Sequence, residues 1–385
     1  MSPVALAVPF TVPSFTDEAI ASVQRVIASG WVTTGAECAG FEEELSAYLG
    51  QPHVVSLTSC THALELSLRA LRLEPGSPVL TPSLTFCGAV AAIIHAGYRP
   101  VLVDIDETTL TPNEETVAKA AARAGAPAAM VVCDMGGYPV DSAALARAAG
   151  LPYHRIVVDA AHGPGGDIGR AREQTAPFAT CLSFYATKNL PIGEGGAVAT
   201  YDGEFAAWLR SARLHGMSKD AWRRYLPGGS WRYDVPEVGF KANLTDIQAT
   251  IGRAQLTALP AWQQRRAELF ARYDAAFAGL VADGRLTLPA RHPGHSLHLY
   301  QVRIPRRDDT IVALTEAGIG TSVHFIPVHV HPYYREKYCY APDDFPVAYD
   351  SFLRAVSLPL SPALSDDDVQ DVAAAVLDVV QSFRR

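Results

Sequence analysis

Between residues 53 and 200, short apolar runs alternate with segments of helical period, and this alternation restricts the chain to few folds. Seven runs have the length and composition of buried strands: HVVSLTS, SPVLTPS, RPVLVDID, AAMVVCD, RIVVDAA, ATCLSFY and GGAVATY. Three segments between them show helical spacing: THALELSLRALRL, GAVAAIIHAG and DSAALARAAG. Continuously apolar strands separated by helices form a mostly parallel sheet that is covered on both faces. We therefore predict an α/β fold.

The pattern changes after residue 203. A helical segment and an irregular aromatic and basic stretch, MSKDAWRRYLPGGSWRYDVPEVGFKAN, precede a helix that Thr245 opens. A long amphipathic helix, PAWQQRRAELFARYDAAFAGL, leads to the strand-like runs HLYQVRI and TSVHF, with the helical segments DTIVALTEAGIG and DDDVQDVAAAVLDVVQSF. We predict two domains: a large α/β domain over residues 1–255 and a smaller α+β domain over residues 256–385.

The segment TDEAIASVQRVIASG predicts a helix near the start of the chain. Thr16 can cap it and Gly30 can end it. Ile20, Val23 and Ile27 share one face.

Charge and cysteine spacing exclude several kinds of partner. The net charge is −8 at pH 7 and no basic run occurs, so nucleic acid and anionic membranes are not expected partners. No apolar stretch approaches the ~20 residues of a membrane span, and the start lacks the charged region of a signal peptide. The six cysteines, at positions 38, 60, 87, 133, 181 and 339, show no CxxC spacing. This favours a cytoplasmic protein with reduced thiols over a disulfide framework or a zinc site.

Lys188 lies where a solvated cation is not expected. In SFYATKNLPIGEGG it follows a predicted strand, adjoins Thr187 and precedes a glycine-rich turn. Most lysines are surface cations, but glycines allow the backbone to approach a ligand closely. A lysine amine in such a site forms a Schiff base with an aldehyde once its pKa is lowered.

Asp159 ends the apolar run RIVVD. Ligands of parallel sheets bind at the carboxyl ends of strands, so Asp159, the turn at residues 59–61 and the segment leading to Lys188 are expected at one edge. Pyridoxal phosphate (PLP) needs a carboxylate that keeps its pyridine nitrogen protonated, together with a Schiff-base lysine. The alternative is that Asp159 only caps a helix or a turn.

The segment SLTSCTHALELSL predicts a strand, a turn of small residues and a helix. Backbone N–H groups at a helix N-terminus, with the hydroxyls of Ser59 and Thr61, suit a phosphate, although any capped helix has this pattern. Ser183 could add a third hydroxyl. Phe86 could stack on a cofactor ring and His162 could contact it; the alternatives are a core aromatic and a structural histidine.

The segment HFIPVHVHPYY contains three histidines. His329 and His331 are two residues apart and would share a face on a strand, with His324 nearby. No acid or cysteine completes a recognisable ligand spacing, so we expect no metal site.

In this order, the segments resemble the DegT/DnrJ/EryC1/StrS family of PLP-dependent sugar aminotransferases. The resemblance covers nearly the whole chain and rests on ASGWVTTGAECAGFEEELSAYLG, TPSLTFCGAVAAIIHAGYRPVLVDID, VVDAAHGPGG, SFYATKNLPIGEGGAVAT, GFKANLTDIQATIGRAQL, GIGTSVHFIPVHVHPYY and SLPLSP. It implies a PLP-dependent transferase of fold type I, the aspartate-aminotransferase-like fold. It also implies a homodimer whose active sites lie between subunits, and it implies that the segment HFIPVHVHPYY lies near the sugar.

The resemblance assigns roles residue by residue. Lys188 matches the lysine that carries the cofactor, Asp159 the partner of the pyridine nitrogen, and His162 a further catalytic position that contacts the cofactor. Lys241 or Asn243 matches residues that reach the phosphate from the other subunit. The positions implied for cofactor binding are Ser59, Cys60, Thr61, Phe86, Asp159, His162, Ser183, Lys188, Lys241 and Asn243.

Three positions depart from the family pattern. Cys60 stands where relatives often carry Gly or Ala, and His62 where a small residue is usual. Asp134 stands where many relatives carry His.

The resemblance implies transfer of an amino group, usually from L-glutamate, to a keto-sugar nucleotide. The segment TKNLPIGEGG favours amination at C4 of a 4-keto-6-deoxyhexose or related sugar. Cyclitol amination and 3-keto-sugar amination remain alternatives, as does a non-catalytic regulator on the same fold. Dehydratases of the family carry histidine at the position of Lys188, which argues against that reaction.

Overall fold

The computed structural model describes residues 7–168, 176–217 and 232–383. Its largest element is a seven-stranded sheet with the order β1-β7-β6-β5-β4-β2-β3. The strands are β1 (His53–Leu57), β2 (Pro78–Pro82), β3 (Arg99–Val103), β4 (Ala129–Cys133), β5 (Ile156–Asp159), β6 (Ala179–Ser183) and β7 (Gly196–Thr200). Only β7 runs antiparallel to its neighbours; the other pairs are parallel. The seven predicted strands and the mostly parallel sheet are therefore confirmed.

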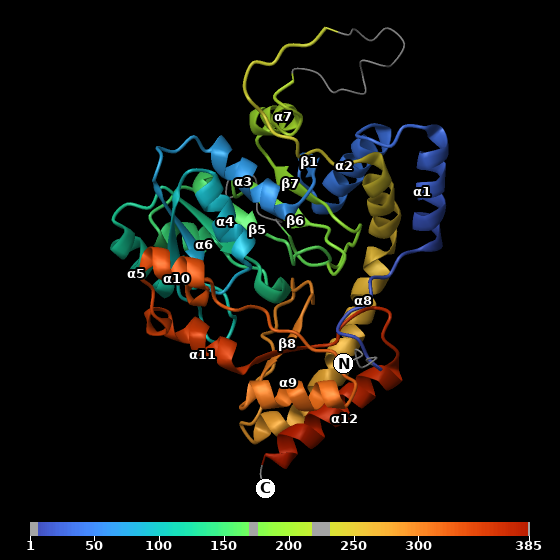
Figure 1. Cartoon of the computed structure of the whole chain (residues 1–385), viewed down its shortest axis with the longest axis vertical. Helices are drawn as coiled ribbons and strands as arrows, with labels where there is room; N and C mark the ends of the chain where they lie inside the picture. The colour runs from blue at the N-terminus through green and yellow to red at the C-terminus, as the bar shows by residue number, and fades with distance from the viewer. Residues whose placement is uncertain (1–6, 169–175, 218–231, 384–385) are drawn as a thin grey trace.

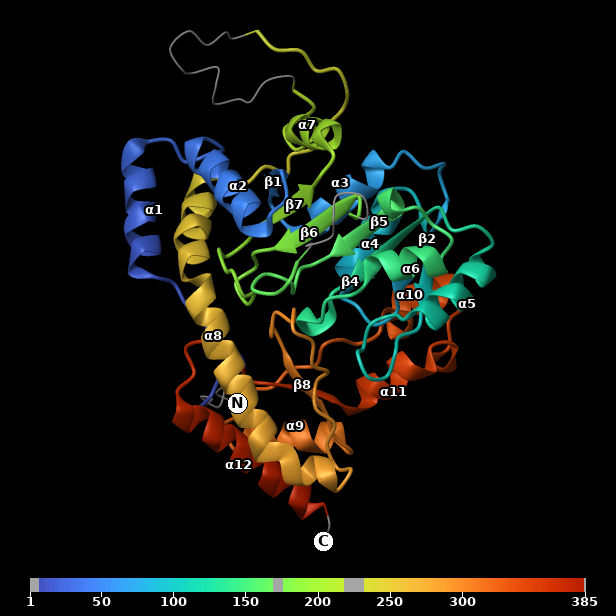
Figure 2. The same ribbon diagram turned by 180° about the vertical axis from the view of Figure 1, so that it is seen from behind.

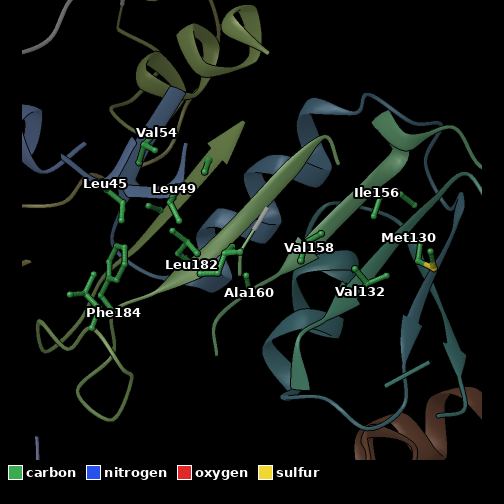
Figure 3. Packing of buried hydrophobic residues seen from close by; sticks show 14 of the residues in the cluster. Leu45, Leu49, Val54, Met130, Val132, Ile156, Val158, Ala160, Leu182 and Phe184 are labelled. Atoms are coloured by element: carbon green, nitrogen blue, oxygen red, sulfur yellow. The ribbon is translucent and has the colours of Figure 1, made fainter. Parts of the chain in front are cut away.

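Helices cover both faces of this sheet (Figures 1 and 2). One face carries α3 (Cys60–Ala70), α4 (Cys87–His95) and α7 (Gly203–Ala212). The other carries α2 (Ala36–Leu49), α5 (Glu114–Ala124) and α6 (Ser142–Ala148). Figure 3 shows part of this second core, where Leu45 of α2 and the strand residues Val158 and Leu182 are buried. Each buried side chain of this size contributes roughly 1.5–3 kcal/mol, so the two apolar layers hold the sheet rigid.

A long helix, α8 (Asp246–Ala282), connects the sheet to a smaller α+β part of the chain (Figure 1). Its first half packs on α1 (Asp17–Ser29) and α2. Its second half packs on the antiparallel pair β8 (Tyr300–Arg303) and β9 (Ala355–Leu358), and Val8 from the N-terminal segment joins the same core. The remaining helices are α9 (Arg307–Glu316), α10 (Pro332–Tyr338), α11 (Pro346–Arg354) and α12 (Asp366–Ser382).

The sequence predicts two helices where α8 is one. Thr245 forms a capping box with Gln248 at its start, as expected, but the helix continues through Pro260. Proline removes one backbone hydrogen bond, and Pro260 is exposed, while Leu259 and Leu269 on either side are buried in the two cores. Packing on both sides therefore holds the helix together. The proposed domain boundary at residues 255 and 256 falls inside α8, and the division stays a prediction.

One smaller expectation was wrong. TSVHF is not a strand: only Ser322 pairs, in an isolated bridge to Ser357, before the chain turns toward the cavity described below. On α1 the buried residues are Ala19, Ser22 and Val26, because small side chains let the helix pack closely on α8. Ile20 and Ile27 are each 57% exposed.

The helices α2, α5, α10 and α11 were not predicted from the sequence. Within the described residues, no helix has both the length and the apolar character needed to cross a membrane. Part of the predicted irregular stretch, residues 218–231, lies outside the described residues.

Candidate active site

A cavity of about 480 Å³ lies at the carboxyl edge of the large sheet. Eight of the ten positions implied for cofactor binding line it: Ser59, Cys60, Thr61, Phe86, Asp159, His162, Ser183 and Lys188. The smaller part of the chain supplies further lining residues: His298, Leu299, His324, Phe325, Leu358 and Leu360. Both parts of the chain therefore form the walls of one cavity, whose size suits a small-molecule ligand.

Lys188 lies in the loop between β6 and β7. Its backbone N–H donates to Tyr185 O at 2.9 Å, and the neighbouring Asn189 anchors the loop by donating to the carbonyls of Pro164 and Ser296, both at 2.9 Å. Burial lowers the pKa of the lysine amine, and the nearby Asp159 carboxylate opposes that shift. A lowered pKa increases the fraction of neutral amine, which is the form that attacks a carbonyl.

Asp159 is the last residue of β5 and is 5% exposed. Its Oδ1 accepts from the Ala161 N–H at 3.1 Å and lies 3.6 Å from Cys60 Sγ. Burial raises the pKa of this carboxyl, whereas the backbone hydrogen bond and the Lys188 cation lower it. A buried cationic partner would stabilise the carboxylate further.

His162 is held in one orientation. Its Nδ1 lies 3.1 Å from the Gly136 N–H, which donates to it, so the neutral ring carries its proton on Nε2. The ring packs against His298 and Phe325, with centroid separations of 4.4 and 5.9 Å. Burial and the Lys188 cation hold the pKa of His162 well below its ordinary value. His162 is therefore a neutral hydrogen-bond donor at the cavity wall.

The turn before α3 has the form expected of a phosphate cradle. Ser59 caps the helix by accepting from the His62 N–H at 3.2 Å, and Ser59, Cys60 and Thr61 all line the cavity. A Cβ on Gly196 would lie 2.4 Å from the Ser59 carbonyl carbon, so only glycine lets β7 pack this closely on the turn. The N-terminus of an 11-residue helix favours an anion here.

These residues fit pyridoxal phosphate. The cavity lining includes the N-terminus of α3 and hydroxyls that could hold a phosphate, and a lysine, Lys188, that could bind an aldehyde. Asp159 supplies a buried carboxylate for a pyridine nitrogen, and Phe86 is an exposed aromatic with its ring centroid 5.8 Å from that of Phe325. When bound, the cofactor would supply an electron sink for a carbanion.

Lys241 and Asn243 do not line this cavity. Lys241 is exposed and pairs with Leu214 in an isolated bridge. Asn243 is buried, and its Nδ2 donates to Thr34 Oγ1 at 2.6 Å. Neither residue reaches the site of its own chain.

His298 lines the cavity and was not predicted from the sequence, whereas His324 lies in the segment HFIPVHVHPYY, which the resemblance implied to be near the sugar. His298 Nδ1 lies 3.0 Å from Asn189 Oδ1, and His324 Nδ1 lies 2.9 Å from Ser357 Oγ. Burial lowers the pKa of both histidines, that of His324 to about 4. Spacing from the end of a strand could not identify His298, because it comes from the smaller part of the chain. His329 is buried against Phe345 instead, and the described residues contain no metal-binding group of three or more His, Cys, Asp or Glu.

Asp134 is buried at the end of β4, and its Oδ1 accepts from the Val140 N–H at 3.1 Å. Burial, reinforced by the Asp159 carboxylate, raises the pKa of Asp134 from 3.8 to about 7. A carboxyl whose folded-state pKa is raised contributes stability that is full below the unfolded pKa and is lost as pH rises through the folded one.

Asp134→Asn keeps an acceptor for Val140 but cannot ionise. Relative to wild type, its free energy of unfolding is expected to rise by roughly 1–3 kcal/mol between pH 5 and pH 8. Urea unfolding at the two pH values measures this, with the exposed Asp371→Asn as a control that shows no such change. A pH-independent difference for Asp134→Asn would contradict the buried-carboxyl account.

The fold and its cavity define a class: a PLP-dependent aminotransferase of fold type I. The model of the DegT/DnrJ/EryC1/StrS aminotransferase family matches residues 13–377. The spore coat polysaccharide biosynthesis protein SpsC of Bacillus subtilis is 42% identical over 381 residues, with 97% of each chain covered. The chain belongs to the DegT/DnrJ/EryC1/StrS aminotransferase family.

Solved structures agree with this assignment. The PLP form of Spr1654 from Streptococcus pneumoniae superposes with a TM-score of 0.86 at 29% identity, covering 97% of this chain and 99% of the other. PseC of Helicobacter pylori, an aminotransferase involved in the biosynthesis of pseudoaminic acid, superposes with a TM-score of 0.86 at 26% identity, covering 98% and 100%. PLP is the cofactor of this family.

Proposed function

We propose that this protein transfers an amino group from an amino acid, L-glutamate, to the keto group of a nucleotide-linked sugar. The proposed position is C4 of a 4-keto-6-deoxyhexose or a related sugar. The carrying observation is that Lys188, Asp159 and His162 line one cavity of suitable size. The names of SpsC and PseC, which refer to polysaccharide and to pseudoaminic acid biosynthesis, support a sugar substrate.

Each side chain has its own role in the proposed reaction. Lys188 holds the cofactor and, as a free amine, moves protons between Cα of the donor and C4′ of the cofactor. Asp159 keeps the pyridine nitrogen protonated. His162 donates from Nε2, because its Nδ1 is occupied by Gly136. The hydroxyls of Ser59, Thr61 and Ser183 bind the phosphate.

We further propose a homodimer in which each chain completes the site of the other. Lys241 is exposed outside its own cavity, where a partner's phosphate could meet it. The exposed Ile20 and Ile27 give α1 an apolar face that a second copy would cover. We place the dimer in the cytoplasm, in keeping with its six free cysteines.

A shared site predicts complementation between two inactive variants. Changing Lys241 and Asn243 together to Ala removes charge-assisted hydrogen bonds worth roughly 1.5–3 kcal/mol, or about ten- to a hundredfold in PLP affinity. Mixing this variant with Lys188→Ala leaves each mixed dimer with one fully wild-type site. Half of the dimers are mixed at equal concentrations, so activity should recover to about one quarter of wild type.

The double variant also removes the hydrogen bond between Asn243 and Thr34 within one chain. The single variant Lys241→Ala keeps that hydrogen bond and is therefore the control for a structural effect of its loss. Native mass spectrometry verifies subunit exchange. Absence of recovery after proven exchange would contradict the shared site and would place both residues outside it.

A substrate panel tests the proposed reaction against its alternatives. Purified enzyme is incubated with L-glutamate and dTDP-, UDP- or GDP-linked 4-keto and 3-keto sugars, or with a keto-cyclitol. Products are identified by mass and NMR. A 4-amino sugar nucleotide is expected; a 3-amino sugar or an amino-cyclitol as the main product would replace the proposed substrate. A protein that binds PLP but aminates none of them would favour a regulator.

A further inference from the structure

The carboxylate of Asp159 is surrounded by thiols. Its register partners in the sheet are Cys133 on β4 and Cys181 on β6, and Cys60 approaches from the first turn of α3. All four side chains are buried. A buried carboxylate therefore has three cysteines around it, contributed by three different elements.

Of the three thiols, only that of Cys60 forms a hydrogen bond with the carboxylate. Its Sγ lies 3.6 Å from Oδ1, the same oxygen that accepts from the Ala161 N–H. Cys181 Sγ instead lies 3.6 Å from Ser67 Oγ. Among the described residues no donor lies on Oδ2, so one oxygen of Asp159 is held and the other remains for a further partner.

The thiol of Cys60 is a neutral donor. A helix N-terminus ordinarily lowers the pKa of a cysteine, but burial, reinforced by the Asp159 carboxylate, raises the pKa of Cys60 well above its ordinary value. An S–H group that donates to a carboxylate stabilises the charged form of the acid. Burial acts on Asp159 in the opposite direction, so this contact offsets part of the cost of keeping the acid ionised.

We propose that Cys60 is a positioning residue for transamination: its thiol orients Asp159 and holds it as a carboxylate for the ring nitrogen of the cofactor. This inference rests on the proposed role of Asp159. Ala is smaller than Cys and is a good helix former, and Cys60 lies in the first turn of α3, so Cys60→Ala is expected to fold.

The test compares Cys60→Ala, which removes the donor, with Cys60→Ser, which restores one. The absorbance of the bound cofactor is titrated with pH in each holoenzyme. Cys60→Ala should move the midpoint to higher pH by about 0.5–1 unit, because less positive charge at the ring nitrogen makes the Lys188 nitrogen release its proton less readily. Cys60→Ser should lie within about 0.2 unit of wild type.

Two further variants distinguish an error in the role of Cys60 from an error in the role of Asp159. Cys181→Ala removes a neighbouring buried thiol without touching the carboxylate, so its midpoint should match wild type; Asp159→Asn should shift further than Cys60→Ala. A Cys60→Ala titration that overlays wild type, beside a shifted Asp159→Asn, would overturn the role of Cys60 alone. An unshifted Asp159→Asn would overturn the role of Asp159, and with it that of Cys60.

Discussion

Lys188→Ala is expected to lower kcat for transamination by at least about 10³-fold, because it removes the group that we propose as both the attachment point of the cofactor and the general base. The backbone of residue 188 and the bonds of Asn189 remain in place, so the loop should keep its conformation. Steady-state kinetics with L-glutamate and the sugar measure the loss, and thermal unfolding shows whether the fold is retained.

Two variants make this result specific. Lys188→Arg keeps the positive charge but cannot bind the cofactor covalently, so it should be as inactive as Lys188→Ala. Lys119→Ala removes an exposed lysine of α5 that pairs with Glu115, and it should have wild-type activity. Turnover near wild type in Lys188→Ala would refute the assignment of the lysine.

Asp159→Asn is expected to lower kcat by roughly 10²-fold, because an amide cannot hold the proton of a pyridine nitrogen by charge. The substitution is close in shape, and its Oδ1 can still accept from the Ala161 N–H. Any structural role as a turn cap is therefore preserved. A loss of activity in Asp159→Asn then results from the loss of the negative charge. Single-turnover kinetics with L-glutamate isolate the step in which this charge acts.

Asp159→Glu is the matched variant, because it retains a carboxylate and should recover part of the activity. Full activity in Asp159→Asn would mean that the residue only caps the turn after β5. Activity retained in Asp159→Asn would also mean that the buried carboxylate of Asp159 has no catalytic role.

The sequence predicts the large sheet well for a physical reason. Strands that are buried on both faces are apolar throughout, and each predicted run became a strand. Ligands of parallel sheets bind at the carboxyl ends of strands. As this rule predicts, Asp159 and Lys188, which come from the carboxyl ends of neighbouring strands, line one cavity.

The smaller part of the chain was harder to predict. Pro260 indicated a helix end, yet tertiary packing carried α8 past it. His298 reaches the cavity through long-range packing that no local sequence pattern predicts. The same holds for the contact between Cys60 and Asp159, because two residues far apart in the sequence meet only when α3 packs on the sheet.

The most direct test of the central claim is a two-step titration of the purified holoenzyme. L-glutamate is added first without a sugar, and a 4-keto-6-deoxyhexose nucleotide follows. We predict that L-glutamate abolishes the absorbance band at about 420 nm and releases one 2-oxoglutarate per site, after which the sugar restores the band and yields one amino sugar. A band that persists with L-glutamate and every other amino acid, or an amino form of the enzyme that no keto sugar restores, would contradict the account.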